Sequence, residues 1–306
     1  MRLGTRGSAL ALAQAQLVAE MLGSDVEVVP VVTRGDRESA GVDDAAGEAS
    51  GDGPAGAPPP GEDKSRWVSE LERALLDGAI DAAVHSAKDV PGEVAEGLLL
   101  VAAPPRAAAE DVLCGAATLA ALGPGARIGT SSVRRVAQLR AARADVEVLA
   151  LHGNVDTRLR RLDAGDFDAI VLARAGLDRL GRGEEAGGAL DFVPAPGQGT
   201  LALQARAADE ATRERLTTIS DERALACLLA ERALAAALGA GCDTPLGAHA
   251  KIEGETMLLR AWIGLPDGSE WVADALSSAA EEPQALGREV AQRLQAAGGE
   301  ELLRRA

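Results

Sequence analysis

The chain of 306 residues is long enough for two or three domains, and its hydrophobic content of 47% is ordinary for a globular protein with a packed core. Only 2% of the residues are aromatic, tyrosine is absent, and the formal net charge is -16, so base stacking and attraction to phosphate backbones are disfavoured. No long apolar segment opens the chain and no run approaches 18 apolar residues. We therefore expect a cytoplasmic protein without a nucleic-acid or membrane partner.

Cysteine usage agrees with this expectation. The three cysteines are far apart and lack the paired spacing of a metal site, which is typical of a reducing compartment and predicts no metal. Cys114 and Cys227 lie in apolar stretches and are expected in the core. Cys242 follows a predicted helix and has Gly241 before it, so its thiol could be exposed on a turn. A single exposed cysteine is usually incidental, but a thiolate in a basic crevice could form a covalent bond.

The first hundred residues predict strands and helices interrupted by an unusual segment. Ser8 is a suitable N-cap for a helix from Ala9 to about Leu22, which Gly23 would end. Residues 41–61 are rich in glycine and proline, with several acids and no base, so we expect a mobile, solvated lid or insertion. The other elements expected here are a strand before Ser8, strands at 26–33, 79–84 and 98–103, and a helix from about residue 64 to Gly78.

Chemistry-bearing side chains gather at the end of one of these strands. The apolar run Ala79–Val84 predicts a buried strand, and His85, Lys88 and Asp89 follow it. The carboxyl ends of strands in open α/β sheets face the ligand crevice, so this placement predicts a site that binds charge and moves protons. Asp89 alone would more often cap a turn. For His85 we prefer a structural role, as a strand-end histidine satisfied by backbone groups.

The second hundred residues alternate strands and helices after a proline pair at 104–105, which is a candidate domain boundary. Such alternation predicts a parallel sheet with crossover helices. The sequence Arg2-Leu-Gly-Thr5 is echoed by Arg127-Ile-Gly-Thr130, and the pattern of residues 78–84 by that of 165–171. Chance could produce either echo alone, but their common order indicates two related halves. The elements expected here are strands at 111–114, 126–130, 146–151 and 167–173, and helices over 132–143 and from Asn154.

The last third predicts a unit of a different kind. Residues 193–199, rich in proline and glycine, form a second hinge candidate before a strand at 201–205. Alternating apolar residues on either side of a turn at Pro266-Asp-Gly268 predict a small antiparallel sheet. The elements expected here are a long helix over 221–238, strands at 246–253, 256–264 and 270–276, and a closing helix after Pro283.

Three strand-to-helix junctions carry the same combination of groups, at residues 4–8, 129–135 and 152–158. Each combines the free N–H groups of a helix start with hydroxyl or guanidinium side chains, which together bind anions. Residues 131–161 hold seven arginines against three acids in a chain that is acidic elsewhere. For one junction, helix caps with solvated arginines explain the pattern equally well. Three together favour carboxylate or phosphate binding, although no glycine-rich nucleotide loop is present.

These motifs resemble those of the hydroxymethylbilane synthase family, also called porphobilinogen deaminases, over nearly the whole chain and in order. The motifs are Thr5-Arg6-x-Ser8-x-Leu-Ala-Leu, Val32-Thr-Arg-Gly-Asp36, Glu70-Leu-Glu-x-Ala-Leu-Leu76, Val84-His-Ser-x-Lys-Asp-Val-Pro91, Gly129-Thr-Ser-Ser-x-Arg-Arg135, Gly153-Asn-Val-x-Thr-Arg-Leu159, Pro196-Gly-Gln-Gly199 and Gly241-Cys-x-x-Pro245. The resemblance implies a transferase of tetrapyrrole (porphyrin, heme) biosynthesis. It would condense four porphobilinogen molecules head to tail with release of ammonia, and then free hydroxymethylbilane by hydrolysis.

The resemblance also implies roles for individual residues. Asp89 matches the catalytic aspartate, and Cys242 matches the cysteine that carries a dipyrromethane cofactor through a thioether. Two positions depart from the family pattern: Lys64 alone remains of a lysine-rich run in the lid, and His152 stands where arginine is common. A histidine is shorter and only partly charged, so one carboxylate contact would be weaker or pH-sensitive. The implied cofactor-binding residues are Cys242, Ser8, Lys88, Ser131, Arg134, Arg135 and Arg158, and the implied substrate-binding residues are Arg6, His152, Arg179 and Lys64.

We therefore expect an α/β protein with two similar α/β domains resembling type II periplasmic binding proteins, plus a small α+β C-terminal domain. The expected domains are residues 1–103 with 197–218, which carry the catalytic aspartate and a lid at 36–63; residues 106–193; and residues 221–306, which carry the cysteine loop. We expect a monomer. From the residues alone, a solute-binding protein with an arginine-lined cleft fits equally well, and the missing export signal and the cysteine loop favour the enzyme. A nucleic-acid binder is a distant third.

Overall fold

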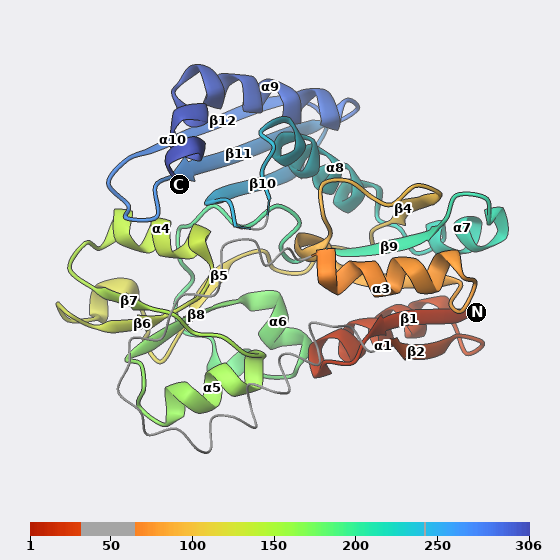
Figure 1. Cartoon of the computed structure of the whole chain (residues 1–306), viewed down its shortest axis with the longest axis horizontal. Coiled ribbons are helices and arrows are strands. Elements are labelled where there is room, and N and C mark those ends of the chain that lie inside the picture. The colour runs from red at the N-terminus through yellow and green to blue at the C-terminus, as the bar shows by residue number, and fades with distance from the viewer. Residues whose placement is uncertain (32–64, 242) are drawn as a thin grey trace.

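The computed structural model describes residues 1–31, 65–241 and 243–306, and the side chains of 65–67 are outside this description. The predicted lid at 36–63 therefore lies outside the described residues. The described chain forms three sheets, each with its own helices, which occupy three corners of the molecule (Figure 1). No helix in these ranges is long and apolar enough to cross a lipid bilayer.

The first sheet has five strands in the order β2-β1-β3-β9-β4. The strand β1 runs parallel to β2 and β3, whereas β9 runs antiparallel to β3 and β4. The sheet is therefore mixed, because the chain reaches β9 only after it has formed the second sheet. Its strands are β1 (Arg2–Arg6), β2 (Glu27–Val31), β3 (Ala82–Ser86), β4 (Leu98–Ala102) and β9 (Leu201–Arg206).

Helices cover both faces of the first sheet. Alternation along β3 explains how: Ala82 and Val84 pack with residues of α1 (Ala9–Leu22) and α7 (Glu210–Thr217). Ala83 points to the other face, where it packs with Leu71 and Leu75 of α3 (Ser65–Leu76). A strand buried on both faces lacks polar alternation, which is why Ala82, Ala83 and Val84 are all apolar.

The second sheet repeats this plan with four strands in the order β5-β8-β6-β7. Its strand β6 is parallel to β7 and β8, but β5 is antiparallel to β8, so this sheet is mixed and not wholly parallel as predicted. The helix α4 packs on one face and α5 and α6 on the other. The elements are β5 (Asp111–Cys114), β6 (Arg127–Gly129), β7 (Glu147–Leu149), β8 (Ala169–Ala173), α4 (Val133–Ala142), α5 (Val155–Asp163) and α6 (Arg174–Arg179).

The sequence echo corresponds to the same interaction in both sheets. The backbone N–H of Arg2 donates to Asp81 Oδ2 at 2.7 Å, and that of Arg127 donates to Asp168 Oδ2 at 2.7 Å. Each arginine also pairs through its guanidinium with the same aspartate. Arg2 lies in β1 and Arg127 in β6, which occupy equivalent places in their sheets. The predicted internal repeat is therefore visible as a repeated strand order and a repeated ion pair.

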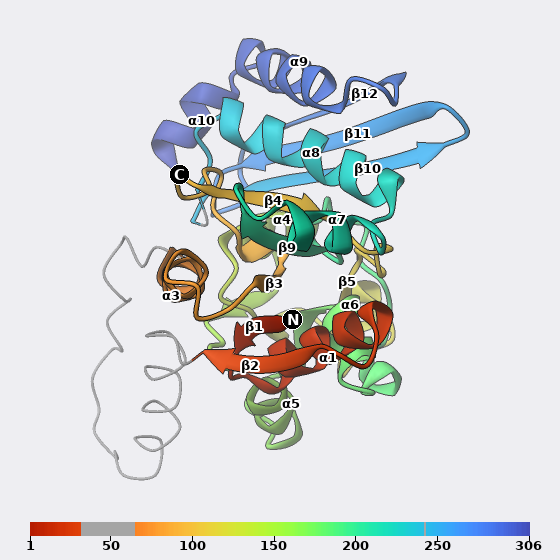
Figure 2. The same ribbon diagram turned by 90° about the vertical axis from the view of Figure 1, so that its right-hand side faces the viewer.

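The third sheet has three antiparallel strands in the order β10-β11-β12. Its hairpins match the alternation of apolar residues seen in the sequence. The helices α8 and α9 cover one face of it (Figure 2). Leu234 of α8 and Val290 of α9 are buried there against Leu259 of β11. The elements are β10 (Leu246–Glu253), β11 (Thr256–Gly264), β12 (Trp271–Ala279), α8 (Glu222–Ala237), α9 (Pro283–Ala296) and α10 (Gly299–Arg305).

Helix boundaries follow local capping signals. The backbone N–H of Ala11 donates to Ser8 Oγ at 3.3 Å, and Gly23 ends α1 with a φ of 103°. In the same way Asn154 caps α5. The helices α6, α7 and α10 and three short 3₁₀ helices lie where no element is predicted. The 3₁₀ helices are η1 (Ala87–Asp89), η2 (Leu119–Ala121) and η3 (Gly183–Glu185).

Candidate active site

Asp89 ends a short turn that neighbouring chain segments hold tightly. The strand β3 extends to Ser86, two residues further than predicted, and runs directly into η1. The N–H of Ala87 donates to Thr200 O at 3.0 Å. Gly197 lies so close that a Cβ on it would meet the carbonyl carbon of Ala87 at 2.9 Å. The segment before β9 thus holds the turn from one side.

A pocket of about 60 Å³ brings Asp89 together with two residues of the first anion-binding junction, Arg6 and Ser8. Its wall also includes Gln14 of α1, whose side-chain amide donates to Ser86 Oγ at 2.9 Å. The pocket therefore places a carboxylate, a guanidinium group and a hydroxyl around one small space. Sequence reasoning predicted Arg6, Ser8 and Asp89 and missed Gln14, a polar residue on the buried side of α1.

His85 lines the same pocket and is 5% exposed. Its Nε2 lies 2.9 Å from Gln204 Oε1, so a side chain satisfies it and not the backbone as predicted. Since the amide oxygen can only accept, Nε2 carries the proton. Burial lowers the pKa of His85 to about 4, despite the hydrogen bond to Gln204 and the nearby charges of Glu72 and Asp89. The ring is therefore neutral at pH 7.

This histidine predicts how stability depends on pH. Between pH 4 and 6.5 the unfolded state binds more protons at His85 than the folded state does. The contribution of His85 to the free energy of unfolding is therefore fully present above pH 6.5 and is lost as the pH falls toward 4. Lowering the pKa of His85 from 6.5 to about 4 corresponds to about 3 kcal/mol. Urea unfolding of the wild type and His85→Gln at pH 7 and pH 4.5 should show the wild type losing about 2–3 kcal/mol more than the variant. Equal losses would contradict this. His249, whose pKa burial lowers to about 3, titrates alike in both proteins.

Arg134 and Arg135 meet on one buried carboxylate. Arg134 Nη1 donates to Asp111 Oδ2 at 2.7 Å, and Arg135 Nε donates to Asp111 Oδ1 at 2.9 Å. Gln198 adds a third bond at 2.9 Å. The structure therefore places both arginines within the second sheet's core, where two guanidinium groups against one carboxylate leave a net positive charge. Sequence reasoning gave Asp111 no role, because nothing local marks the acid that begins an apolar strand.

The carboxylate stays ionised in this cluster. Burial alone would raise the pKa of Asp111, but the two guanidinium groups outweigh burial and hold it well below its usual range. Replacing Asp111 by asparagine would leave two buried charges without a counterion. We expect the free energy of unfolding to fall by about 3–5 kcal/mol. Asp166→Asn, which breaks an exposed pair with Arg161, should cost less than about 1 kcal/mol. Denaturant unfolding that gives equal losses would contradict the assignment.

Two other predicted donors have buried atoms without partners among the described residues, Ser131 Oγ and Arg179 Nε. Thr200 Oγ1, which sequence reasoning missed, is a third such atom. Burial, together with the charge of Arg135, lowers the pKa of Arg158 to about 10, and burial lowers that of Arg179 to about 10. Both remain charged at neutral pH. Desolvated guanidinium groups and orphaned hydroxyls fit a ligand that brings several carboxylates, as a dipyrromethane does.

Of the four remaining predicted residues, two lie within the described chain and two do not. Lys88 is half-buried on the turn beside Asp89, and His152 is exposed before α5. Lys64 and Cys242 lie outside the described residues. Near Cys242 in the sequence, Thr244 Oγ1 accepts from the N–H of Gly241 at 2.9 Å.

The two segments that link the first and second sheets are joined to the third by a buried ion pair. Arg106 Nη1 lies 2.6 Å from Glu231 Oε1 on α8, and the glutamate side chain is fully buried. Glu231 also accepts from the N–H of Gly197 at 2.6 Å and from that of Ala250 at 2.7 Å. Sequence reasoning missed this junction, although an acid in the middle of an alanine- and leucine-rich helix was a usable signal.

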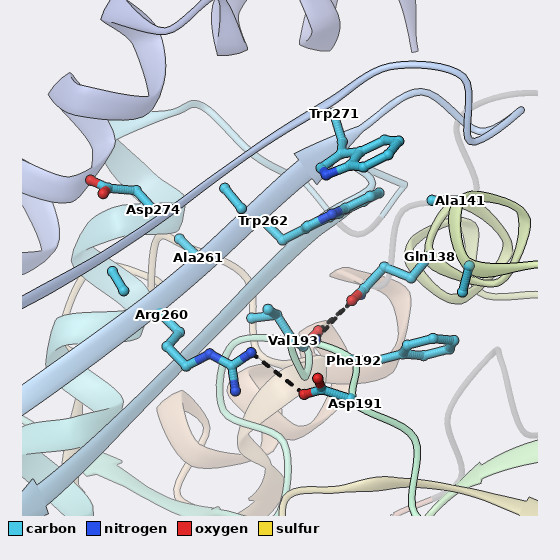
Figure 3. Close-up of a pocket in the computed structure, with 13 residues that line it drawn as sticks. Gln138, Ala141, Asp191, Phe192, Val193, Arg260, Ala261, Trp262, Trp271 and Asp274 are labelled. Atoms are coloured by element: carbon cyan, nitrogen blue, oxygen red, sulfur yellow. Dashed lines mark hydrogen bonds and ion pairs between the residues drawn. The ribbon is translucent and has the colours of Figure 1, made fainter. Parts of the chain in front are cut away.

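A larger pocket, of about 540 Å³, lies elsewhere. It is bounded by α4, residues 191–193 and the open face of the third sheet, where Trp262 and Trp271 lie side by side (Figure 3). Arg260 faces Asp191 across it at 3.6 Å. None of the predicted site residues lines this pocket. Charge and orphaned donors, and not pocket size, therefore locate the candidate active site.

Comparisons with known proteins agree with the resemblance. Two family profiles match: "Porphobilinogen deaminase, dipyromethane cofactor binding domain" over residues 1–214 and "Porphobilinogen deaminase, C-terminal domain" over residues 225–296. Relatives named porphobilinogen deaminase include one from Roseiflexus castenholzii, 42% identical over 99% of this chain and 98% of its own length. Another, from Xanthomonas oryzae pv. oryzae, is 44% identical over 99% of this chain and 98% of its own length.

Among solved structures, a periplasmic substrate-binding protein of an ABC transporter from Coxiella burnetii is similar, with a TM-score of 0.41 and 14% identity, covering 72% of this chain and 91% of that one. A putative methionine-binding lipoprotein from Bacillus subtilis has a TM-score of 0.40 and 12% identity, covering 72% and 89%. These TM-scores are too low to support a conclusion about this chain. The sequence matches do support one, because they cover the first and second sheets, which carry the aspartate and the arginines, as well as the third sheet. This chain belongs to the porphobilinogen deaminase family.

Proposed function

We propose that this chain condenses four porphobilinogen molecules head to tail, releasing one ammonia at each step, and then frees hydroxymethylbilane by hydrolysis. Family membership supports the reaction class. The observation that carries the proposal for this chain is the pocket that sets the Asp89 carboxylate beside Arg6 and Ser8. A carboxylate steadies a cation, and the arginine and hydroxyl bind the acid groups of a pyrrole.

In each cycle the bond between the aminomethyl carbon of porphobilinogen and its nitrogen breaks, and ammonia leaves. Asp89 stabilises the positive charge that this leaves on the substrate-derived ring and its methylene. A new carbon–carbon bond then forms between that methylene and a free pyrrole α-carbon, which loses its proton. Because Asp89 ends a turn that β3 and the segment before β9 hold, its carboxylate faces the pocket without reorganising.

When bound, the dipyrromethane supplies the free α-carbon on which chain growth begins. Cys242 would hold it through a thioether, and Ser131, Arg158 and the residues beside Asp89 would hold its carboxylates. Arg134 and Arg135 contribute mainly through charge, because their guanidinium groups already donate to Asp111 and to backbone carbonyl oxygens. Arg179 has a buried Nε that has no partner among the described residues, and it is a candidate for direct contact with substrate. The other residues proposed for these roles are Arg6, Ser8, Lys88, His152 and Lys64.

We also propose that the chain works as a monomer in the cytoplasm, in the three-domain division given above. Free, buried thiols at Cys114 and Cys227 support a reducing compartment. Sedimentation velocity should give a species of 31.2 kDa plus its cofactor. A species of twice that mass would contradict the monomer.

The test of the function is incubation of the purified protein with porphobilinogen. We expect ammonia to be released, and porphyrin to form after acid and oxidation. A solute-binding protein, the rival suggested by an arginine-lined cleft, would bind porphobilinogen without releasing ammonia. Binding without ammonia release, by protein that carries the cofactor, would overturn the proposal.

A further inference from the structure

Arg232, in the middle of α8, reaches out of the third sheet's helical layer to the catalytic turn. Its guanidinium donates to three successive carbonyl oxygens just after Asp89: Val90 O at 3.2 Å, Pro91 O at 2.7 Å and Gly92 O at 2.8 Å. These bonds cross 140 to 142 residues of sequence. They join the turn to a helix that belongs to a different sheet.

Arg232 makes no ion pair with any residue that the structure describes. Burial lowers the pKa of its guanidinium, which remains charged. A desolvated arginine is usually retained beside a carboxylate, because burial of an unpaired charge is costly. Here the three carbonyl dipoles take that place. The planar guanidinium holds its donors at fixed angles to them, whereas the donors of a lysine ammonium rotate. The arrangement therefore fixes the backbone that follows Asp89.

The neighbouring residue on the same helix acts in the same direction. Glu231 accepts from the N–H of Gly197, and Gly197 packs against the carbonyl carbon of Ala87 in the catalytic turn. Consecutive side chains of α8 thus hold the turn from two sides, Arg232 directly and Glu231 through Gly197. Both residues lie in the middle of α8, a rigid helix that runs from Glu222 to Ala237.

We propose that Arg232 is a positioning residue, which fixes the backbone after Asp89 to α8 and so holds the carboxylate in the pocket that it shares with Arg6 and Ser8. The catalytic consequence of this inference rests on the proposed function, whereas the anchoring of the turn by Arg232 does not. Arg232 lies outside the pocket that Asp89 shares with Arg6 and Ser8. Its loss should therefore disturb the geometry of the carboxylate and leave substrate binding largely intact.

Two variants and one matched control test this. Arg232→Gln removes the charge and the fork, and Arg232→Lys keeps the charge without the fork. Arg223→Gln, on the first turn of the same helix, removes a bond to Gly254 O, which lies at the β10–β11 turn of the same unit. Hydrogen exchange of the peptide spanning residues 86–94, the mass of the attached cofactor, and steady-state kinetics with porphobilinogen are measured on each folded protein.

For Arg232→Gln we expect amide exchange in residues 86–94 to quicken about tenfold or more. We expect kcat to fall about 10- to 100-fold with KM changed less than about threefold, because a misplacement of about 1 Å suffices for such a loss. Arg232→Lys should give an exchange rate and a kcat between those of Arg232→Gln and the wild type. Arg223→Gln should match the wild type in both. Unchanged exchange in Arg232→Gln would overturn the proposal, whether or not the protein turns over porphobilinogen. A raised KM with unchanged kcat would overturn it too, since Arg232 would then bind substrate. Faster exchange in protein that carries cofactor but releases no ammonia would leave the anchoring established and refute the proposed function instead.

Discussion

Replacement of Asp89 by asparagine should leave a folded protein whose turnover of porphobilinogen falls by about 10²- to 10³-fold. Asparagine has the same shape and can still accept a hydrogen bond, so the turn at Ala87–Asp89 should persist. What it lacks is the charge. A unit charge about 4 Å from a developing cation, at the effective dielectric constant of a partly buried site, is worth about 4 kcal/mol. Loss of that stabilisation in the transition state corresponds to about three powers of ten in rate.

The controls separate charge from damage. Asp77→Asn removes an exposed carboxylate outside the pocket and should leave kcat unchanged. Asp89→Glu keeps the charge on a longer side chain and should retain more activity than Asp89→Asn. Rates are compared per molecule of protein that carries the two cofactor pyrroles by intact mass. A kcat for Asp89→Asn within about threefold of the wild type would show that the carboxylate does not stabilise the reacting cation.

Replacement of Cys242 by serine should abolish both covalent cofactor attachment and turnover. A serine hydroxyl is far less acidic than a thiol and cannot form the thioether. The two other cysteines cannot substitute, because burial raises the pKa of Cys114 and of Cys227 to about 11. At neutral pH both are thiols enclosed in apolar cores, and neither presents a thiolate to a pyrrole.

The readout is the intact mass of the purified protein. Wild-type protein should carry two added pyrrole units, and Cys242→Ser should show the polypeptide alone. Cys227→Ala is the matched control, since it removes a buried thiol, and it should keep the added mass at some cost in stability. Added mass on Cys242→Ser, or its loss from Cys227→Ala alone, would move the attachment to another residue.

Local signals predicted much of this fold. The hydroxyl of Ser8 and the freedom of Gly23 determine where α1 begins and ends, and these depend only on nearby backbone groups. Alternation along β11 likewise reflects one buried and one open face within a single hairpin. The echo between Arg2 and Arg127 predicted two similar sheets, because each arginine pairs with an aspartate of the echoed second motif.

Long-range contacts account for what could not be predicted. The direction of β9 depends on where the chain returns from the second sheet, and no pattern within Leu201–Arg206 encodes it. The bond from His85 to Gln204 spans 119 residues, so the sequence could indicate only that the histidine is buried. Arg134 and Arg135 were predicted from composition as free anion ligands, whereas their pairing with Asp111 depends on tertiary packing.

The most direct test of the account is a crystal structure of the purified protein with its cofactor attached. We predict density continuous with Cys242 Sγ, and pyrrole N–H groups within about 3.5 Å of the Asp89 carboxylate. The acid groups of the pyrroles should lie against serine and arginine side chains of the first two sheets. Density at Cys242 with the Asp89 carboxylate turned away from every pyrrole, and those arginines bound only to protein groups, would contradict the account.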